Sequence, residues 1–210
     1  MKAGIIGCGS IAKYRHAPEY AANPYVKHIV FYDRNPERAR ALAELFDGSV
    51  AASVDELLAD PTVDVISDCS SNESHHIFST KALLSGKHVL CEKPIALTVE
   101  HAQQMIEAEK QSGKKLMIDH NQRFTRAHQK VKAMLATKEL GDVLTFRTTF
   151  GHQGPEHWSV NASNATWFFK KGRSGFGVAG DLGIHKIDLL HYLLEDEMEY
   201  VSAFHETLDK

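Results

Sequence analysis

The chain has 210 residues, of which 43% are hydrophobic and 24% charged, and this composition favours a folded core. Its formal net charge of −3 gives no reason to expect a strongly basic surface for a nucleic acid. Its three cysteines are too widely spaced for a disulfide framework or a zinc site, so a reducing compartment is the simpler interpretation. Neither a secretion signal nor an apolar run near the roughly 18 residues of a membrane span is visible, and we expect a cytoplasmic protein without nucleic-acid or membrane partners.

Residues 1–120 alternate short apolar runs with helical patterns, which is typical of an α/β doubly wound parallel sheet with crossover helices. Strands are predicted at residues 3–6, 27–32, 49–51, 63–67, 88–90 and 116–118. Asn35 and Pro36 are expected to open one helix, and Thr98 to cap another helix that Gly113 ends. We therefore assign residues 1–120 to a first domain.

The pattern changes after residue 119. A helix is expected near residues 128–137, then a strand at 143–150, a polar loop at 151–166 and a glycine-rich turn at 172–180. A helix at 182–194 and a strand at 200–206 follow. These elements predict a second, partial α+β domain at residues 121–210.

A glycine turn lies directly between the first predicted strand and a helical segment. Gly7 permits the tight turn, Gly9 allows the backbone to approach a pyrophosphate, and Ala12 keeps the helix close to the strand. This is the context that a dinucleotide-binding fingerprint requires. The alternative is a strand-to-helix turn without a ligand.

An acidic residue follows the second predicted strand at the distance that this fingerprint needs. Asp33 lies 24 residues beyond Gly9, where a carboxylate accepts hydrogen bonds from the adenosine ribose. A carboxylate there repels a 2′-phosphate, so we expect NAD as the cofactor. Arg34 leaves NADP open as an alternative, because a guanidinium could bind that phosphate.

Two further motifs carry groups that exchange protons. Lys93 in Cys91-Glu92-Lys93-Pro94 follows a predicted strand and so lies at the carboxyl edge of the sheet, although a solvated lysine is the alternative. Asp181 and His185 are four residues apart, so Asp181 is expected to accept the Nδ1–H of His185 and leave Nε2 free as a base or acid. The alternatives are an exposed ion pair and a helix cap.

The 13 histidines show no zinc spacing, and no metal site is predicted.

In combination, these motifs resemble the glucose–fructose oxidoreductase, inositol dehydrogenase and MocA family of NAD(P)-dependent oxidoreductases, over essentially the whole chain. The resemblance implies a Rossmann domain followed by an open, mostly antiparallel sheet, through which the chain is expected to form a homo-oligomer. It implies catalytic roles for Lys93, Asp181 and His185. It also implies cofactor contacts from Gly7, Gly9, Ser10, Ile11, Asp33, Arg34, Ser70, Asn72, His75, Glu92, Lys93 and Asn121.

Together, the motifs and the resemblance predict hydride transfer between NAD and a secondary alcohol of a sugar, cyclitol or related polyol. Two other functions stay open: a non-catalytic NAD(P)-binding sugar sensor, and redox-assisted glycoside hydrolysis with retained NAD. Family members typically continue well beyond residue 210, so the chain is expected to be a shortened form or a fragment. If it is the whole protein, its substrate pocket is expected to lack walls.

Overall fold

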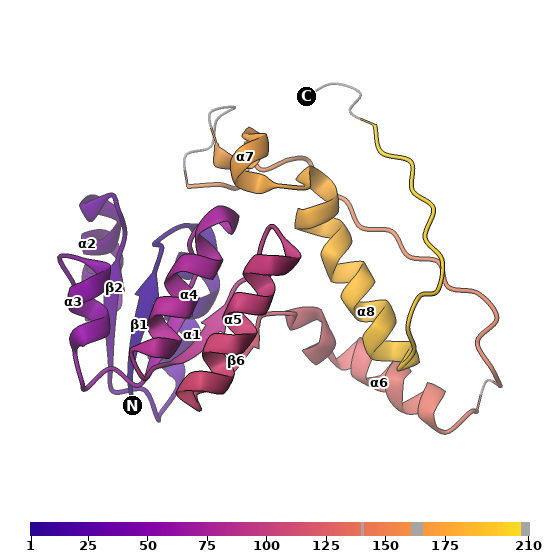
Figure 1. Cartoon of the computed structure of the whole chain (residues 1–210), viewed down its shortest axis with the longest axis horizontal. Coiled ribbons are helices and arrows are strands. Elements are labelled where there is room, and N and C mark those ends of the chain that lie inside the picture. Colours follow the sequence, from indigo (N-terminus) through magenta and orange to yellow (C-terminus); the bar gives the residue numbers. More distant parts are fainter. Residues whose placement is uncertain (140, 161–165, 207–210) are drawn as a thin grey trace.

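A computed structural model describes residues 1–139, 141–160 and 166–206, and its first part is a six-stranded sheet (Figure 1). The strand order is β3-β2-β1-β4-β5-β6, and every neighbouring pair is parallel. The strands are β1 (Lys2–Ile6), β2 (His28–Tyr32), β3 (Ser49–Val50), β4 (Val65–Asp68), β5 (His88–Cys91) and β6 (Leu116–Ile118). The predicted doubly wound parallel sheet is therefore confirmed, with strand ends shifted by one or two residues.

Helices connect successive strands and continue beyond the sheet. Within the sheet region they are η1 (Ala12–His16), α1 (Ala17–Ala22), α2 (Pro36–Leu45), α3 (Val54–Ala59), η2 (Asn72–Ser74), α4 (His75–Leu84) and α5 (Val99–Ser112). After β6 they are η3 (Asn121–Phe124), α6 (Arg126–Ala136), η4 (Trp167–Phe169), α7 (Lys171–Ser174), η5 (Ala179–Gly183) and α8 (Ile184–Leu194). None of the described helices is long and apolar enough to cross a membrane.

Local signals fix the ends of these helices. The Asn35 side chain accepts the N–H of Glu37 at the start of α2, and the Thr98 side chain accepts the N–H of His101 at the start of α5. Gly113 ends α5 with φ +65°, a left-handed conformation that glycine adopts at no steric cost. The caps that the sequence predicts are therefore present.

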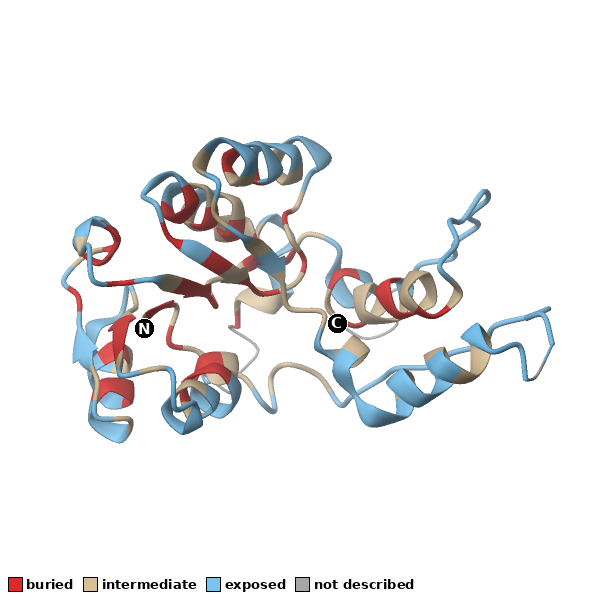
Figure 2. Cartoon of the chain, turned by 90° about the horizontal axis from the view of Figure 1, so that it is seen from below, coloured by how far each residue is buried: buried red, intermediate tan, exposed pale blue. Residues whose placement is uncertain are grey.

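The hydrophobic core lies on both faces of the sheet. Successive strand residues point to opposite faces, so Ile5 and Ile6 of β1 belong to two different buried clusters. One cluster includes Ile66 and Met105, and the other includes Phe31. Figure 2 shows the buried residues gathered in the sheet and its flanking helices, whereas the helices after β6 are mainly exposed or half-buried.

Two predicted strands of the second part are not formed. Residues 143–150 and 200–206 have no strand pairing in the described part of the chain, and Leu144 and Tyr200 are more than nine-tenths exposed. Alternating hydrophobicity favours an extended backbone, but a strand also needs a neighbour that exchanges hydrogen bonds with it. The antiparallel sheet expected for residues 121–210 is therefore not seen among the described residues.

Unlike the two strands, the helices predicted near residues 128–137 and at 182–194 are present, as α6 and α8. α6 packs against α8, where the Lys132 ammonium lies 4.4 Å from the Tyr192 ring centre and donates to the Tyr192 carbonyl oxygen at 2.5 Å. The helix expected at residues 182–194 begins earlier, because η5 runs directly into α8. Asp181 therefore lies inside a helical turn rather than at its cap. Positions 161–165 of the predicted polar loop lie outside the described residues.

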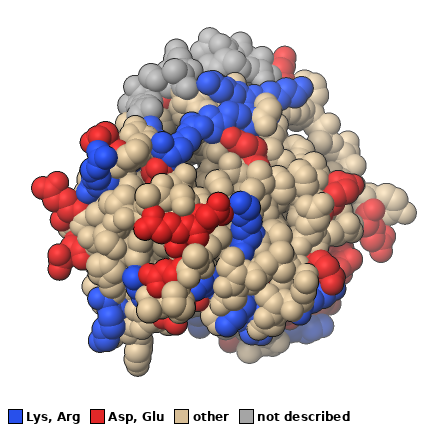
Figure 3. Space-filling model, turned by 60° about the vertical axis from the view of Figure 1, so that its left-hand side comes forward, with Lys and Arg blue, Asp and Glu red and all other residues tan. Residues whose placement is uncertain are grey.

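Charge is distributed without a single dominant sign. Figure 3 shows acidic and basic side chains interspersed over one face of the molecule, with a short band of Lys and Arg near its top. This mixture agrees with the small formal net charge of the chain.

Candidate active site

A cleft of about 400 Å³ opens at the carboxyl ends of the strands, where the strand order reverses between β1 and β4. Ligands of open α/β sheets bind at this topological switch point. Among the predicted site residues, the cleft is lined by Gly7, Gly9, Ser10, Ile11, Asp33, Arg34, Ser70, Asn72, His75, Glu92, Lys93 and Asp181. Neither Asn121, which lies exposed in η3, nor His185 is among the lining residues.

Gly7 closes the turn between β1 and η1. Its φ of +91° is a conformation that other residues rarely adopt, and a Cβ there would lie 2.5 Å from the Cys69 carbonyl oxygen. The Gly7 N–H donates to the Tyr32 carbonyl oxygen at 2.8 Å, which joins the turn to β2. The position therefore requires glycine for both conformation and space.

Gly9 and Asp33 border the part of the cleft that a dinucleotide would fill. A Cβ at Gly9 would meet no atom within 4 Å, so any side chain there would extend into open space beside the turn. The Asp33 carboxylate accepts the N–H of Cys8 and the N–H of Asn35, each at 2.8 Å. Each carboxylate oxygen keeps a second lone pair, which leaves it able to accept a ribose hydroxyl.

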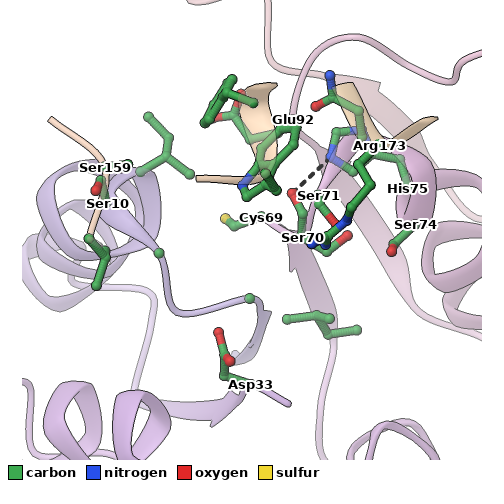
Figure 4. A pocket seen from close by; sticks show the side chains of 18 of the residues that line it. Ser10, Asp33, Cys69, Ser70, Ser71, Ser74, His75, Glu92, Ser159 and Arg173 are labelled. Carbon is green, nitrogen blue, oxygen red and sulfur yellow. Dashed lines mark hydrogen bonds between the residues drawn. The ribbon is translucent and has the colours of Figure 1, made fainter. Parts of the chain in front are cut away.

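Two segments from the second part of the chain complete the cleft. The Ser10 hydroxyl donates to the Trp158 carbonyl oxygen at 2.9 Å, and Trp158 packs edge-on against Phe168, with ring centres 5.0 Å apart. On the other side, the Arg173 guanidinium donates to the Ser71 hydroxyl at 3.1 Å and to the Glu73 carboxylate at 2.5 Å. In Figure 4, Ser10 and Ser159 lie on one side of the cleft and Arg173 on the other, with Asp33 below them.

Lys93 lies at the meeting point of the two parts. Its ammonium donates to Asp181 twice, to Oδ1 at 2.8 Å and to the backbone carbonyl oxygen at 2.9 Å. Both side chains are only 16% exposed. An ammonium carries three N–H donors, and the described residues accept two of them, which leaves one donor for a ligand in the cleft. The Lys93–Pro94 peptide bond is cis.

The expected hydrogen bond between Asp181 and His185 is absent, and that prediction is wrong. Asp181 binds Lys93 instead, while the buried His185 Nδ1 has no hydrogen-bond partner in the described part of the chain. The His185 ring packs edge-on against Phe150, with ring centres 5.8 Å apart. Burial, followed by the positive charge of Lys93, lowers the pKa of His185 to about 4. The imidazole is therefore neutral at physiological pH.

The other oxygen of Asp181 faces a histidine that the sequence analysis did not assign to the site. His152 Nε2 lies 3.4 Å from Asp181 Oδ2, and its Nδ1 accepts the Gly154 N–H at 3.0 Å. Because Nδ1 is an acceptor, the ring proton of a neutral His152 is on Nε2, facing the carboxylate. Nothing in the sequence pairs His152 with Asp181, because the two residues are 29 positions apart.

A second missed histidine lies beneath Glu92. His16 Nε2 lies 3.0 Å from Glu92 Oε1 and 3.5 Å from Asp119 Oδ2. These three side chains are the one group of possible metal ligands found among the described residues. The imidazole nitrogen already shares its proton with Glu92 at hydrogen-bond distance, so we interpret the group as a hydrogen-bonded cluster.

Fold and cleft together define a protein of the dinucleotide-binding Rossmann class. The NAD-binding Rossmann-fold model of the GFO/IDH/MocA oxidoreductase family matches residues 1–120, and the family's C-terminal domain model matches residues 128–210. The chain therefore belongs to the GFO/IDH/MocA family, and its first part is the NAD-binding domain.

Relatives of known activity act on sugars. The chain is 32% identical over 196 residues to D-glucoside 3-dehydrogenase of Escherichia coli K12, covering 92% of this chain and 54% of that protein. It is 33% identical over 195 residues to 1,5-anhydro-D-fructose reductase of Ensifer adhaerens, covering 92% and 56%. The chain thus spans about half the length of the curated relatives it matches.

Solved structures of similar fold contain cofactor and sugar. Levoglucosan dehydrogenase in complex with NADH and levoglucosan superposes with a TM-score of 0.84 at 30% identity, over 92% of this chain and 54% of that one. GenD2 of gentamicin A biosynthesis in complex with NAD gives a TM-score of 0.78 at 26% identity, over 92% and 53%.

Proposed function

We propose that this chain acts as an NAD-dependent oxidoreductase on a secondary alcohol of a sugar or polyol. The single observation that carries the proposal is the Lys93 ammonium, held by Asp181 at the carboxyl edge of the sheet with one N–H donor that no described residue accepts. NAD, when bound, supplies a hydride acceptor for the carbinol carbon. NADP remains the alternative cofactor that Arg34 suggests.

Three side chains would divide the work on the substrate. The free N–H of Lys93 holds the oxygen of the reacting hydroxyl, and Asp181 keeps the ammonium in place. His185 is neutral, so its ring can take the hydroxyl proton as the carbinol carbon becomes a carbonyl carbon. In the reverse direction the same ring returns the proton. His152 on the outer oxygen of Asp181 gives this carboxylate a second N–H donor.

The sugar substrate class is inferred from the relatives. The proteins similar to this chain are named for a glucoside, an anhydrofructose and levoglucosan, which are cyclic sugar derivatives with several secondary hydroxyls. The domain boundary at residue 120 and assembly with further copies of the chain both stay predictions, and no particular sugar is predicted.

Cofactor binding can be tested through intrinsic fluorescence, because both tryptophans of the chain, Trp158 and Trp167, line the cleft. We expect NAD to change the fluorescence at lower concentration than NADP does, and a sugar and polyol panel to produce NADH. Binding without turnover would favour a sensor. Retained NAD with glycoside cleavage and no net NADH would favour the redox-assisted hydrolase.

The catalytic roles are tested with Lys93→Met and His185→Ala. Each change should lower kcat by about 10²–10⁴-fold, the range that one acid–base group contributes, while leaving the Kd for NAD within a few-fold. Lys110→Met is the matched control, because its side chain is 68% exposed on α5, outside the cleft. Unchanged turnover in both Lys93→Met and His185→Ala would remove the proposed mechanism.

A further inference from the structure

We infer that His16 is a positioning residue: it fixes the Glu92 carboxylate, and this carboxylate in turn fixes the backbone from which Lys93 extends. The inference rests on the proposed function for its catalytic consequence, but not for the contacts themselves. His16 ends η1, the helix that follows the glycine turn, and is only 5% exposed.

The carboxyl ends of three neighbouring strands converge on His16. Ser67 lies in β4, Glu92 follows β5 and Asp119 follows β6. His16 Nδ1 lies 3.2 Å from the Ser67 hydroxyl, and Nε2 faces both carboxylates. Both imidazole nitrogens therefore have partners, and the ring is held from two sides.

Glu92 passes this constraint to Lys93. Its Oε1 accepts from His16 at 3.0 Å, and its Oε2 accepts the backbone N–H of Lys93 at 3.2 Å. No other acceptor for this N–H is present among the described residues, whereas the Glu92 N–H donates to the Asp68 carbonyl oxygen at 2.9 Å. A backbone hydrogen bond to β4 thus fixes the Glu92 N–H, whereas only the Glu92 side chain accepts the Lys93 N–H among the described residues.

Without His16, Glu92 Oε1 would lose its hydrogen-bond donor, and the carboxylate would keep only the Lys93 N–H on Oε2. Glu92 is buried and its negative charge raises the pKa of Asp119, after burial itself. Two close carboxylates with no N–H donor between them repel each other. Glu92 would rotate away and release the Lys93 N–H, and the ammonium would lose its alignment toward a substrate.

The kinetic test compares His16→Leu with His16→Gln, whose amide can still donate to Glu92. We expect His16→Leu to lower kcat by up to ~10²-fold, the effect of a catalytic group misplaced by about 1 Å. KM and the Kd for NAD should change by less than about threefold, and His16→Gln should recover most of kcat. Tyr20→Phe is the matched control, because the Tyr20 hydroxyl contacts Ser67 at 2.6 Å in the same buried network without touching Glu92.

A second readout does not depend on turnover. Amide hydrogen exchange at Lys93 should accelerate by about tenfold in His16→Leu, because its N–H loses its acceptor, and should stay slow in His16→Gln and Tyr20→Phe. The Glu92 N–H is the internal reference and should stay protected in every variant, since β4 supplies its acceptor.

Two results would overturn the inference. One is unchanged exchange at Lys93 in His16→Leu. The other is equal loss of kcat in His16→Leu and Tyr20→Phe, which would mean general destabilisation. If the unmodified chain oxidises no polyol, the proposed function fails, and exchange at Lys93 still decides the role of His16.

Discussion

The sheet region and the region after β6 differ in how they are held together. Both large buried clusters lie within the first 108 residues. After β6, the buried hydrophobic side chains in the described part of the chain are Leu182, Leu189 and Leu193, all from η5 and α8. The first region is therefore a closed core, whereas the second depends on ion pairs and on its contacts with the first.

The chemistry nevertheless needs both regions. Lys93 comes from the first and Asp181 from the second, and a 2.8 Å ion pair joins them. A rigid sheet thus presents the lysine, and a less densely packed element supplies its carboxylate. Four predictions, from the largest expected effect to the smallest, test this difference.

Truncation of a core side chain should cost most in the first region. Ile66→Ala empties a fully buried site in β4 and should lower the free energy of unfolding by about 4 kcal/mol, against about 2 kcal/mol for Leu193→Ala in α8. Urea unfolding followed by circular dichroism measures both. Equal losses would contradict the contrast between the regions.

In the second region, the ion pair between Arg123 and the buried Asp188 carboxylate should contribute to stability. The Asp188 carboxylate is buried and accepts from Arg123 through both Nε and a terminal nitrogen. Arg123 keeps 41% of its side chain exposed, so Asp188→Asn should cost only about 1–2 kcal/mol. Amide exchange should accelerate in α8 and η3 but not in the sheet. Acceleration throughout the sheet would show that the two regions unfold as one unit.

Acidification should destabilise the second region through His185. Its pKa falls from 6.5 to about 4 on folding, so the folded state binds fewer protons than the unfolded state between these values. Stability is therefore unaffected above about pH 6.5, decreases as the pH falls from 6.5 to 4, and levels off below. Because His185 is only half-buried, we expect a change of about 1 kcal/mol, less than the full shift implies. Thermal unfolding of His185→Gln should lack this part of the pH dependence; an identical profile would contradict it.

Exposed ion pairs should behave alike in both regions. Arg15 pairs with Glu19 on η1 and α1, and Lys138 pairs with Asp142 after α6, each four residues apart with side chains more than 60% exposed. Replacing Arg15 or Lys138 by Ala should change stability by less than about 0.5 kcal/mol. Thermal unfolding at low and high salt would measure this. A larger loss at one site would show that exposed charges add to the difference between the regions.

Prediction from sequence succeeded where the signal is local. The short apolar runs in β1 and β2, the caps at Asn35 and Thr98, and the glycine at position 7 each act within a few neighbours, so the chain around them decides their structure. The strands expected at residues 143–150 and 200–206 failed because strand formation depends on a partner, which alternation cannot supply.

The candidate site shows the same difference between features that local sequence predicts and contacts that depend on tertiary packing. The sequence by itself determined the glycine turn, the acidic residue after β2 and the position of Lys93 at the edge of a parallel sheet, because these follow from strand ends and short spacings. Only the tertiary structure decided that Asp181 binds Lys93 rather than His185, and that His16 meets Glu92 across 76 positions. Such pairings depend on how separate elements pack, since burial and electrostatic attraction act between neighbours in space, whatever their distance along the chain.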